Sequence, residues 1–152
     1  MKGFILSVAL LFSASSFANE VADLVKVYNS QQFVNFLSGE KDRQDDCYPL
    51  PDRQSCVKFG CSTVRRFECN DQHEIQRMFE ACKGNYGDTC LRKAVSFLRS
   101  FEFDDLDEME ELANGCRGLF DVSCVDFVCQ RLGTFKCDDR QEIIAVLSQC
   151  KY

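Results

Sequence analysis

The sequence predicts an all-α protein, in which antiparallel helical hairpins repeat every 34 residues, stack into an α-solenoid and are crosslinked by disulfides. A fixed sequence period and a matching set of cysteines predict this class. Three stretches align at a spacing of 34 residues, and each begins and ends with a cysteine: 56–82, 90–116 and 124–150. A period of about 20–50 residues is typical of stacked repeats, which bury their apolar faces against their neighbours.

The first helix of each repeat is predicted by apolar and small residues at offsets of three, four, seven and ten, which share one face of an α-helix. In the first copy these residues are Val57, Gly60, Cys61, Val64 and Phe67. Small residues recur at Gly60 and at its equivalent Ala94, so we expect two helices to approach closely there.

The second helix of each repeat has a start signal, an Asp followed three residues later by a Glu. The pairs are Asp71 with Glu74, Asp105 with Glu108, and Asp139 with Glu142. In such a capping box the Asp accepts a hydrogen bond from an orphan backbone N–H, and the Glu accepts one from the cap residue's own N–H. The recurring Glu therefore has a structural role, and we do not expect it to be catalytic. Glycines soon after the helix, Gly84 and Gly118, predict left-handed turns.

The N-terminus has the features of a signal peptide over residues 1–18. Lys2 supplies the charge, Phe4 to Phe12 the apolar run, and Ser16 and Ala18 the small residues of a cleavage site. The apolar run is shorter than the ~20 residues of a membrane span, so no span is expected. The rest of the chain, 19–152, is predicted to be a single repeat domain. Its parts are a degenerate capping unit and linker (19–54) and three repeats (55–88, 89–122 and 123–152).

The capping unit is predicted to be helical. Its apolar residues Val21, Leu24, Val25 and Tyr28 share one face, and Phe33 is in register with the later repeats. It lacks the opening cysteine and the capping box, as expected of a terminal repeat, because one face of such a repeat meets water. Residues 41–54 are polar, contain both prolines and form the predicted linker.

Charge and cysteine content limit the function classes. A net charge of −6 argues against nucleic acid and against an anionic membrane surface as partners. Eleven cysteines behind a signal peptide predict disulfides, which form in oxidising compartments, so we expect a periplasmic or secreted protein. The only histidine is His73, and no Cys-x-x-Cys pair occurs, so no metal and no cofactor are expected.

The middle repeat provides an internal comparison for the cysteine pairing. There, Val95 and Phe103 stand at the positions of Cys61 and Cys69. Joint loss indicates partnership, so we predict a Cys61–Cys69 bridge. The same reasoning predicts the third-repeat bridge Cys129–Cys137.

Two schemes remain open for the other seven cysteines. The first joins consecutive hairpins, leaves Cys150 free for a disulfide-linked dimer, and has the pairs Cys47–Cys56, Cys82–Cys90 and Cys116–Cys124. The second closes each hairpin, leaves Cys47 alone, and has the pairs Cys56–Cys82, Cys90–Cys116 and Cys124–Cys150. We favour the first scheme, because its loops are nearly equal in length.

A gap of seven residues separates four cysteine pairs: Cys61/Cys69, Cys82/Cys90, Cys116/Cys124 and Cys129/Cys137. With the period and the hairpin pattern, this gap resembles the secreted cysteine-rich branch of the tetratricopeptide superfamily over the stretch from Cys47 to Tyr152. The Trp, Leu-Gly, Tyr and closing Pro positions of tetratricopeptide repeats are absent, so no functional residue is carried over. The resemblance implies a stack that binds proteins or peptides along a curved surface.

The loops after the second helices carry a recurring basic residue and an aromatic residue. These are Lys83 with Tyr86 and Arg117 with Phe120, and Lys151 is a truncated echo in the third repeat. Because aromatic and Arg side chains are enriched at binding hot spots, we predict that Lys83, Tyr86, Arg117 and Phe120 bind an unidentified protein or peptide. No nucleophile motif or phosphate loop is found, so no catalysis is expected. Two alternatives remain: a small secreted enzyme or effector with a site that includes His73 across repeats, and an apolar-ligand carrier lined by some of the 14 phenylalanines.

Overall fold

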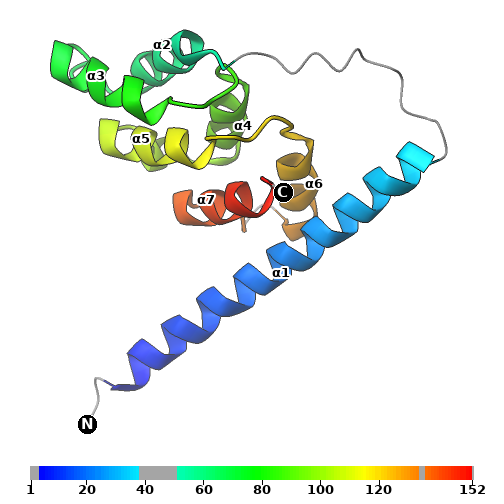
Figure 1. Ribbon diagram of the computed structural model, residues 1–152. Coiled ribbons are helices and arrows are strands. Elements are labelled where there is room, and N and C mark those ends of the chain that lie inside the picture. Colours follow the sequence, from blue (N-terminus) through cyan, green and yellow to red (C-terminus); the bar gives the residue numbers. More distant parts are fainter. Residues whose placement is uncertain (1–3, 38–50, 134–135, 152) are drawn as a thin grey trace.

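The computed structural model describes residues 4–37, 51–133 and 136–151, and the side chains of the first helix over 16–32. These residues form seven α-helices and one short 3-10 helix (Figure 1). They are α1 (Phe4–Leu37), α2 (Arg53–Thr63), α3 (Gln72–Ala81), α4 (Thr89–Phe97), η1 (Ser100–Glu102), α5 (Leu106–Gly115), α6 (Ser123–Leu132) and α7 (Arg140–Gln149). The described residues contain no strand, so the all-α prediction is confirmed.

The helices after α1 pack in successive pairs. Helix α2 packs on α3, α4 on α5, and α6 on α7. The second helices also pack on one another, because α3 contacts α5 and α5 contacts α7, and Figure 1 shows these helices one beyond the other. Each helix pair therefore buries residues both within the pair and against the next pair.

The core contains the residues that the helical period predicts. Met78, Met109 and Ile143 are fully buried on the three second helices. A Cβ at Gly60 would lie 2.6 Å from the Cε atom of Met78, which confirms the predicted close approach at this glycine. Ile75 is in register with Met109 and Ile143 but is 45% exposed, because α3 packs on α5 at one side and has no further second helix at the other.

The phenylalanines expected at the end of the first-helix faces lie outside the helices. Helix α2 ends at Thr63 and α4 ends at Phe97, so Phe67 and Phe101 fall in the connecting segments. Phe67 is 75% exposed and Phe101 is 56% exposed, so their assignment to the buried face is wrong. A spacing that fits a helical face has no meaning once the backbone leaves the helix. The equivalent Phe135 and the side chain of Phe33 lie outside the described residues.

Aspartates cap all three second helices, as predicted. Asp71 accepts from the backbone N–H of Glu74 at 2.9 Å, and Glu74 accepts from that of Asp71 at 3.3 Å, which completes a capping box. Asp105 and Asp139 also accept hydrogen bonds from the first turn of their helices. Among the described helices the box is complete only at α3: at α5 Glu108 accepts from the backbone N–H of Asp104 instead of Asp105, and at α7 Glu142 Oε2 has no hydrogen-bond partner among the described residues. Burial, with the nearby charge of Asp139, raises the pKa of Glu142.

Five disulfides crosslink the described helices, and they correct the favoured pairing. They are Cys56–Cys82, Cys90–Cys116, Cys124–Cys150, Cys61–Cys69 and Cys129–Cys137. The last two confirm the prediction from the middle repeat. The scheme with Cys82–Cys90, Cys116–Cys124 and Cys47–Cys56 is wrong, and the scheme that closes each hairpin is found.

The physical reason lies in the helix lengths. A first helix of 9–11 residues is followed by a second helix of ten, so the start of the first lies beside the end of the second. The Cα atoms of the three closing bridges are consequently only 5.7–5.9 Å apart. Cys150 is bonded to Cys124 in its own chain, so the predicted dimer through Cys150 is wrong as well. Cys47, the remaining cysteine, lies outside the described residues.

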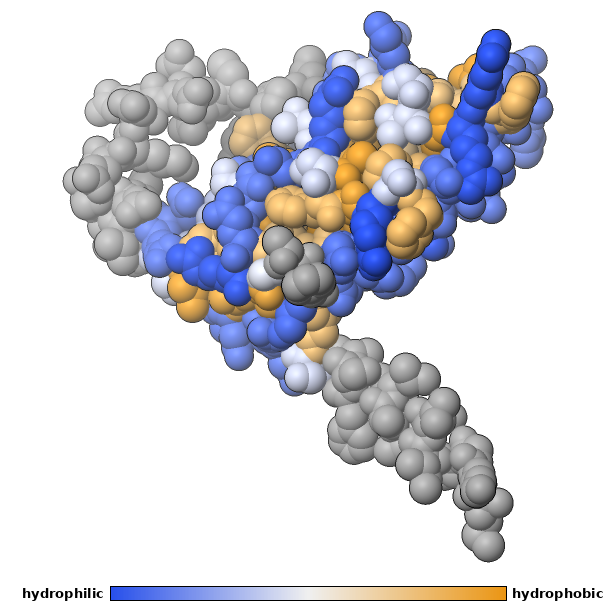
Figure 2. All heavy atoms as spheres, turned by 180° about the vertical axis from the view of Figure 1, so that it is seen from behind, coloured by the Kyte–Doolittle hydropathy of each residue, from blue (hydrophilic) through white to orange (hydrophobic). Residues whose placement is uncertain are grey.

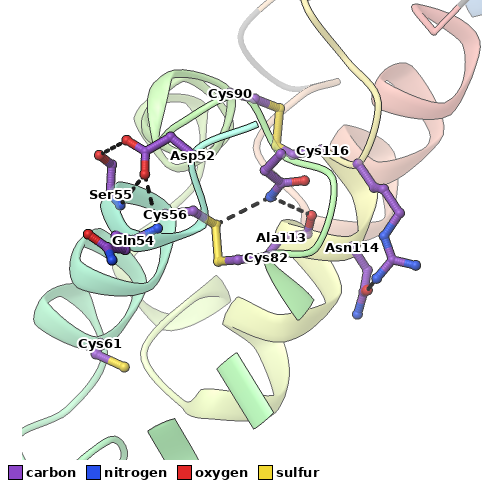
Figure 3. Close-up of a disulfide and its surroundings, with 12 residues drawn as sticks. Asp52, Gln54, Ser55, Cys56, Cys61, Cys82, Cys90, Ala113, Asn114 and Cys116 are labelled. Atoms are coloured by element: carbon purple, nitrogen blue, oxygen red, sulfur yellow. Dashed lines mark hydrogen bonds between the residues drawn. A yellow bond between two sulfur atoms is a disulfide. The ribbon is translucent and has the colours of Figure 1, made fainter. Parts of the chain in front are cut away.

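One buried amide ties the first closing bridge to the second hairpin. Asn85 is 1% exposed, and its Nδ2 donates to the Ala113 carbonyl at 3.0 Å and to Cys56 Sγ at 3.3 Å. Figure 3 shows Ala113 beside the Cys56–Cys82 bridge. Ala113 lies in the last turn of α5, where carbonyls have no partner within the helix. Asn85 therefore caps the next hairpin from the loop of the preceding one.

Helix α1 packs on the last hairpin, against α6 and α7. Its predicted apolar face is confirmed, because Val21, Val25 and Tyr28 are buried. The Tyr28 ring centroid lies 5.3 Å from that of Phe127, and its hydroxyl donates to Asp121 at 3.0 Å. Although the sequence register places this unit before α2, it covers the opposite end of the chain (Figure 1). Within the described residues, no helix combines the length and apolar character that a membrane span requires.

Candidate binding site

The structure brings the four predicted binding residues together, because the loops that carry them lie side by side. The backbone N–H of Gly118 donates to the Gly84 carbonyl at 3.1 Å, which joins the loop after α5 to the loop after α3. Both glycines have positive φ angles, +77° and +83°, as the sequence predicts. The rings of Tyr86 and Phe120 meet almost perpendicularly, with centroids 5.7 Å apart. Phe120 is 49% exposed, so part of this aromatic pair reaches the surface.

Arg117 crosses from the second hairpin to the first. Its Nη2 donates to the Asn114 side chain at 2.8 Å and to the Glu80 carbonyl at 3.3 Å. Glu80 lies in the last turn of α3, and its carbonyl also accepts from the backbone N–H of Lys83 at 3.1 Å, so the guanidinium adds a further donor at that helix end. An arginine has five N–H donors, and the Nε and Nη1 groups of Arg117 donate to no described residue. They therefore remain available to a ligand.

A groove of about 510 Å³ runs across α3 and α5 beside these loops. Its lining residues are His73, Gln76, Arg77, Glu80, Ala81, Lys83, Glu110, Asn114 and Arg117. All of them except Ala81 are polar or charged residues, and the aliphatic parts of their side chains also line the groove.

Ion pairs hold the two helices that form the groove. Arg77 on α3 pairs with Asp107 and, at 2.9 Å, with Glu110, both on α5. Hydrogen bonds to Asp107 and then to Glu110 raise the pKa of Arg77. The positive charge of Arg77 is thus used within the protein, unlike that of Lys83 at the end of the groove.

His73, the residue on which the enzyme alternative depends, lies exposed at the edge of this groove. The carboxylates near it have other partners: Glu80 accepts from Gln76 at 3.1 Å, and Glu110 pairs with Arg77. A base needs a nucleophile and an orienting group within hydrogen-bond reach, and the described residues present no such set around His73.

An acidic cluster forms where α5 begins. Ligand atoms of Asp104, Asp105 and Glu108 lie within 4.8 Å of one another. Each already has a structural partner, because Asp104 pairs with Arg65, Asp105 caps α5, and Glu108 pairs with Arg140. These carboxylates therefore hold neighbouring hairpins together.

The exposure of two phenylalanines was not predicted from the sequence. Phe67 and Phe101 occupy equivalent positions in two repeats, and both reach solvent. Apolar side chains do reach the surface between charged ones over the helical domain (Figure 2). The signal that could have identified them is a phenylalanine shortly before each capping aspartate, beyond the end of the preceding helix.

The fold and the groove define a class, an all-α protein whose helices are crosslinked by disulfides and which has a groove across α3 and α5. No protein-family model, curated protein or solved structure matches the chain. The functional conclusion therefore depends on the geometry of the groove and its loops.

Proposed function

We propose that this protein is an exported, disulfide-crosslinked stack of helical-hairpin repeats that binds a protein or peptide and performs no catalysis. The observation that carries the proposal is the pair of adjoining loops, which present exposed cations and a partly exposed aromatic pair beside the groove across α3 and α5. Tyr and Arg are common anchors at protein interfaces.

The repeat stack is supported by contacts that recur in register. Arg65 pairs with Asp104 at 2.5 Å, and the residues one period later, Arg99 and Asp138, pair at 3.3 Å. The three closing bridges each span 26 residues, again one period apart. Such repetition is what identical units produce when each contacts the next in the same way.

Export is supported by the bridges themselves. Disulfides persist in oxidising compartments, and this chain forms five of them in its described part. Together with the predicted signal peptide at 1–18, they favour a periplasmic or extracellular location. In such a place a rigid scaffold benefits binding, because little conformational entropy is lost when the partner docks.

A selection from a random peptide-display library tests the proposal. The oxidised protein, purified after export, is the bait, and enriched peptides are measured by fluorescence anisotropy against wild type and Arg117→Gln. Lys58→Gln is the matched control, because Lys58 is an exposed cation on α2 outside the groove. We expect enriched peptides to lose affinity for Arg117→Gln and to keep it for Lys58→Gln. A library that yields no enriched peptide would refute the proposed function.

A further inference from the structure

A row of cations runs along the loop edge of the hairpins. Lys83, Arg117 and Lys151 each follow directly the cysteine that closes their hairpin, and they are one period apart. A Cβ at Gly84, next to Lys83, would lie 3.1 Å from Arg117 Cγ. The pKa of Lys151 is lowered, mainly by burial and secondly by the positive charge of Arg117, so the two cations interact electrostatically. The three residues thus occupy the same register position, directly after the three closing bridges, and we call them the basic row.

The cations of this row form no ion pair with the described residues. Eight other basic residues form ion pairs there: Lys26, Arg65, Arg77, Arg92, Lys93, Arg99, Lys136 and Arg140. None of the three row residues has a carboxylate partner among the described residues, although acidic residues outnumber basic ones, 24 to 18. The ends of α3, α5 and α7 favour cations through the helix dipole, but a dipole end carries only about half a charge.

Three adjacent cations therefore give a local positive potential on an acidic protein. Such a site attracts carboxylates and steers them. The aromatic pair Tyr86 and Phe120 lies in the same two loops and offers an apolar contact beside the charges. A folded acidic domain would have to fit this edge by shape, whereas an extended segment needs only carboxylates at the spacing of the repeats.

We propose that the ligand is an acidic peptide segment, whose carboxylates pair with Lys83, Arg117 and Lys151 and whose apolar side chains contact Tyr86 and Phe120. This inference rests on the proposed function and specifies its partner. The Nε and Nη1 donors of Arg117, which no described residue uses, each donate to a carboxylate oxygen, and such charge-assisted hydrogen bonds are stronger than neutral ones.

The test reverses the charge of the row. The peptide-display selection is run with the oxidised wild type, with a Lys83→Glu, Arg117→Glu, Lys151→Glu variant, and with a matched Lys58→Glu, Arg66→Glu control. Circular dichroism and non-reducing electrophoresis verify that each variant keeps its helices and bridges. We expect wild type and control to enrich acidic peptides, and the row variant to enrich neutral or basic ones.

The outcomes separate the two proposals. An absence of enrichment refutes the proposed function and this inference together. Enrichment of peptides without excess acid, or unchanged acidic enrichment by the row variant, overturns the inference and leaves the proposed function standing. For the best acidic peptide, anisotropy should show at least about a tenfold loss of affinity for the row variant, and the loss should shrink at high salt. Equal competition by an oligothymidine of the same charge would overturn the assignment to a peptide.

Discussion

Replacement of Asn85 by Asp tests whether one buried amide holds two hairpins together. The side chain is 1% exposed, and its Nδ2 donates to the Ala113 carbonyl and to Cys56 Sγ. A carboxylate would lose both donated hydrogen bonds and place an acceptor against the carbonyl oxygen at the end of α5. It would also be charged in a site that excludes water.

The magnitude follows from these contacts. Two lost hydrogen bonds cost about 1 kcal/mol each, and an unsatisfied buried carbonyl costs about 1–3 kcal/mol more. We therefore expect Asn85→Asp to lower the free energy of unfolding by about 3–5 kcal/mol at neutral pH. Asn85→Leu is the matched control, because Leu119 occupies the equivalent position and is only 3% exposed. This variant buries an apolar group instead, so we expect a loss of about 1–2 kcal/mol.

The pH dependence of the free energy of unfolding distinguishes the cost of a buried charge from the cost of altered packing. Burial raises the pKa of a carboxyl in the folded state above its unfolded value, so the penalty grows as the pH rises between those two values. At acid pH the carboxyl is neutral in both states, and the difference between Asn85→Asp and wild type should shrink. Equilibrium urea unfolding at neutral and acid pH, without reductant, measures both effects. A loss under 1 kcal/mol at neutral pH, or a gap that does not narrow in acid, would refute the reasoning.

Replacement of Cys61 by Val and Cys69 by Phe, the residues of the middle repeat, should cost less than about 2.5 kcal/mol, because an apolar contact replaces the crosslink. This limit is the chain-entropy value for a bridge with a sequence separation of eight. Urea unfolding measures this cost, and a larger loss contradicts the internal comparison. Thiol titration of the denatured, unreduced protein should find one thiol per chain, which Cys47→Ser removes; two or more thiols would contradict the five bridges. Burial and the charge of Asp121 raise the pKa of Tyr28 from 10.0 to about 12. The protonated Tyr28 hydroxyl should therefore stabilise the docked α1 fully below pH 10, and this contribution should be lost as the pH rises from 10 to 12. Phenolate absorbance against Tyr28→Phe measures this titration, and a transition already complete near pH 10 is the contrary outcome.

Helical periodicity predicts much of this fold, because a buried face repeats every 3.6 residues wherever the helix continues. It placed Met78, Met109 and Ile143 in the core, and they are fully buried. It failed for Phe67 and Phe101, since residues in the connecting segments can fit the same spacing by chance. The capping aspartates predict where the second helices begin. No residue in the sequence predicts equally well where the first helices end.

Cysteine spacing left the pairing undecided for a physical reason. A seven-residue gap and a 26-residue separation recur equally well in the sequence, and only the helix lengths choose between them. The Cys61–Cys69 bridge was predictable, because the middle repeat lacks both cysteines together. The position of α1 was not, because sequence register describes order along the chain and says nothing about which hairpin has an uncovered face.

For the candidate site, the recurring loop pattern sufficed to select Lys83, Tyr86, Arg117 and Phe120, and the structure brings these residues together. It did not reveal the groove, because its walls come from α3 and α5 through residues such as Gln76 and Asn114 that carry no repeated pattern. Nor did it reveal Asn85, since the equivalent residue one period later is apolar. A contact between two different repeats is invisible to a comparison of repeats with one another.

The docking of α1 on α6 and α7 also sets an order on biogenesis. The segment that leaves the ribosome first packs on the segment that leaves it last. Until then Val21, Val25 and Tyr28 have no surface to cover, so the growing chain exposes the apolar face of α1. The fold is therefore complete only after the last hairpin has been synthesised.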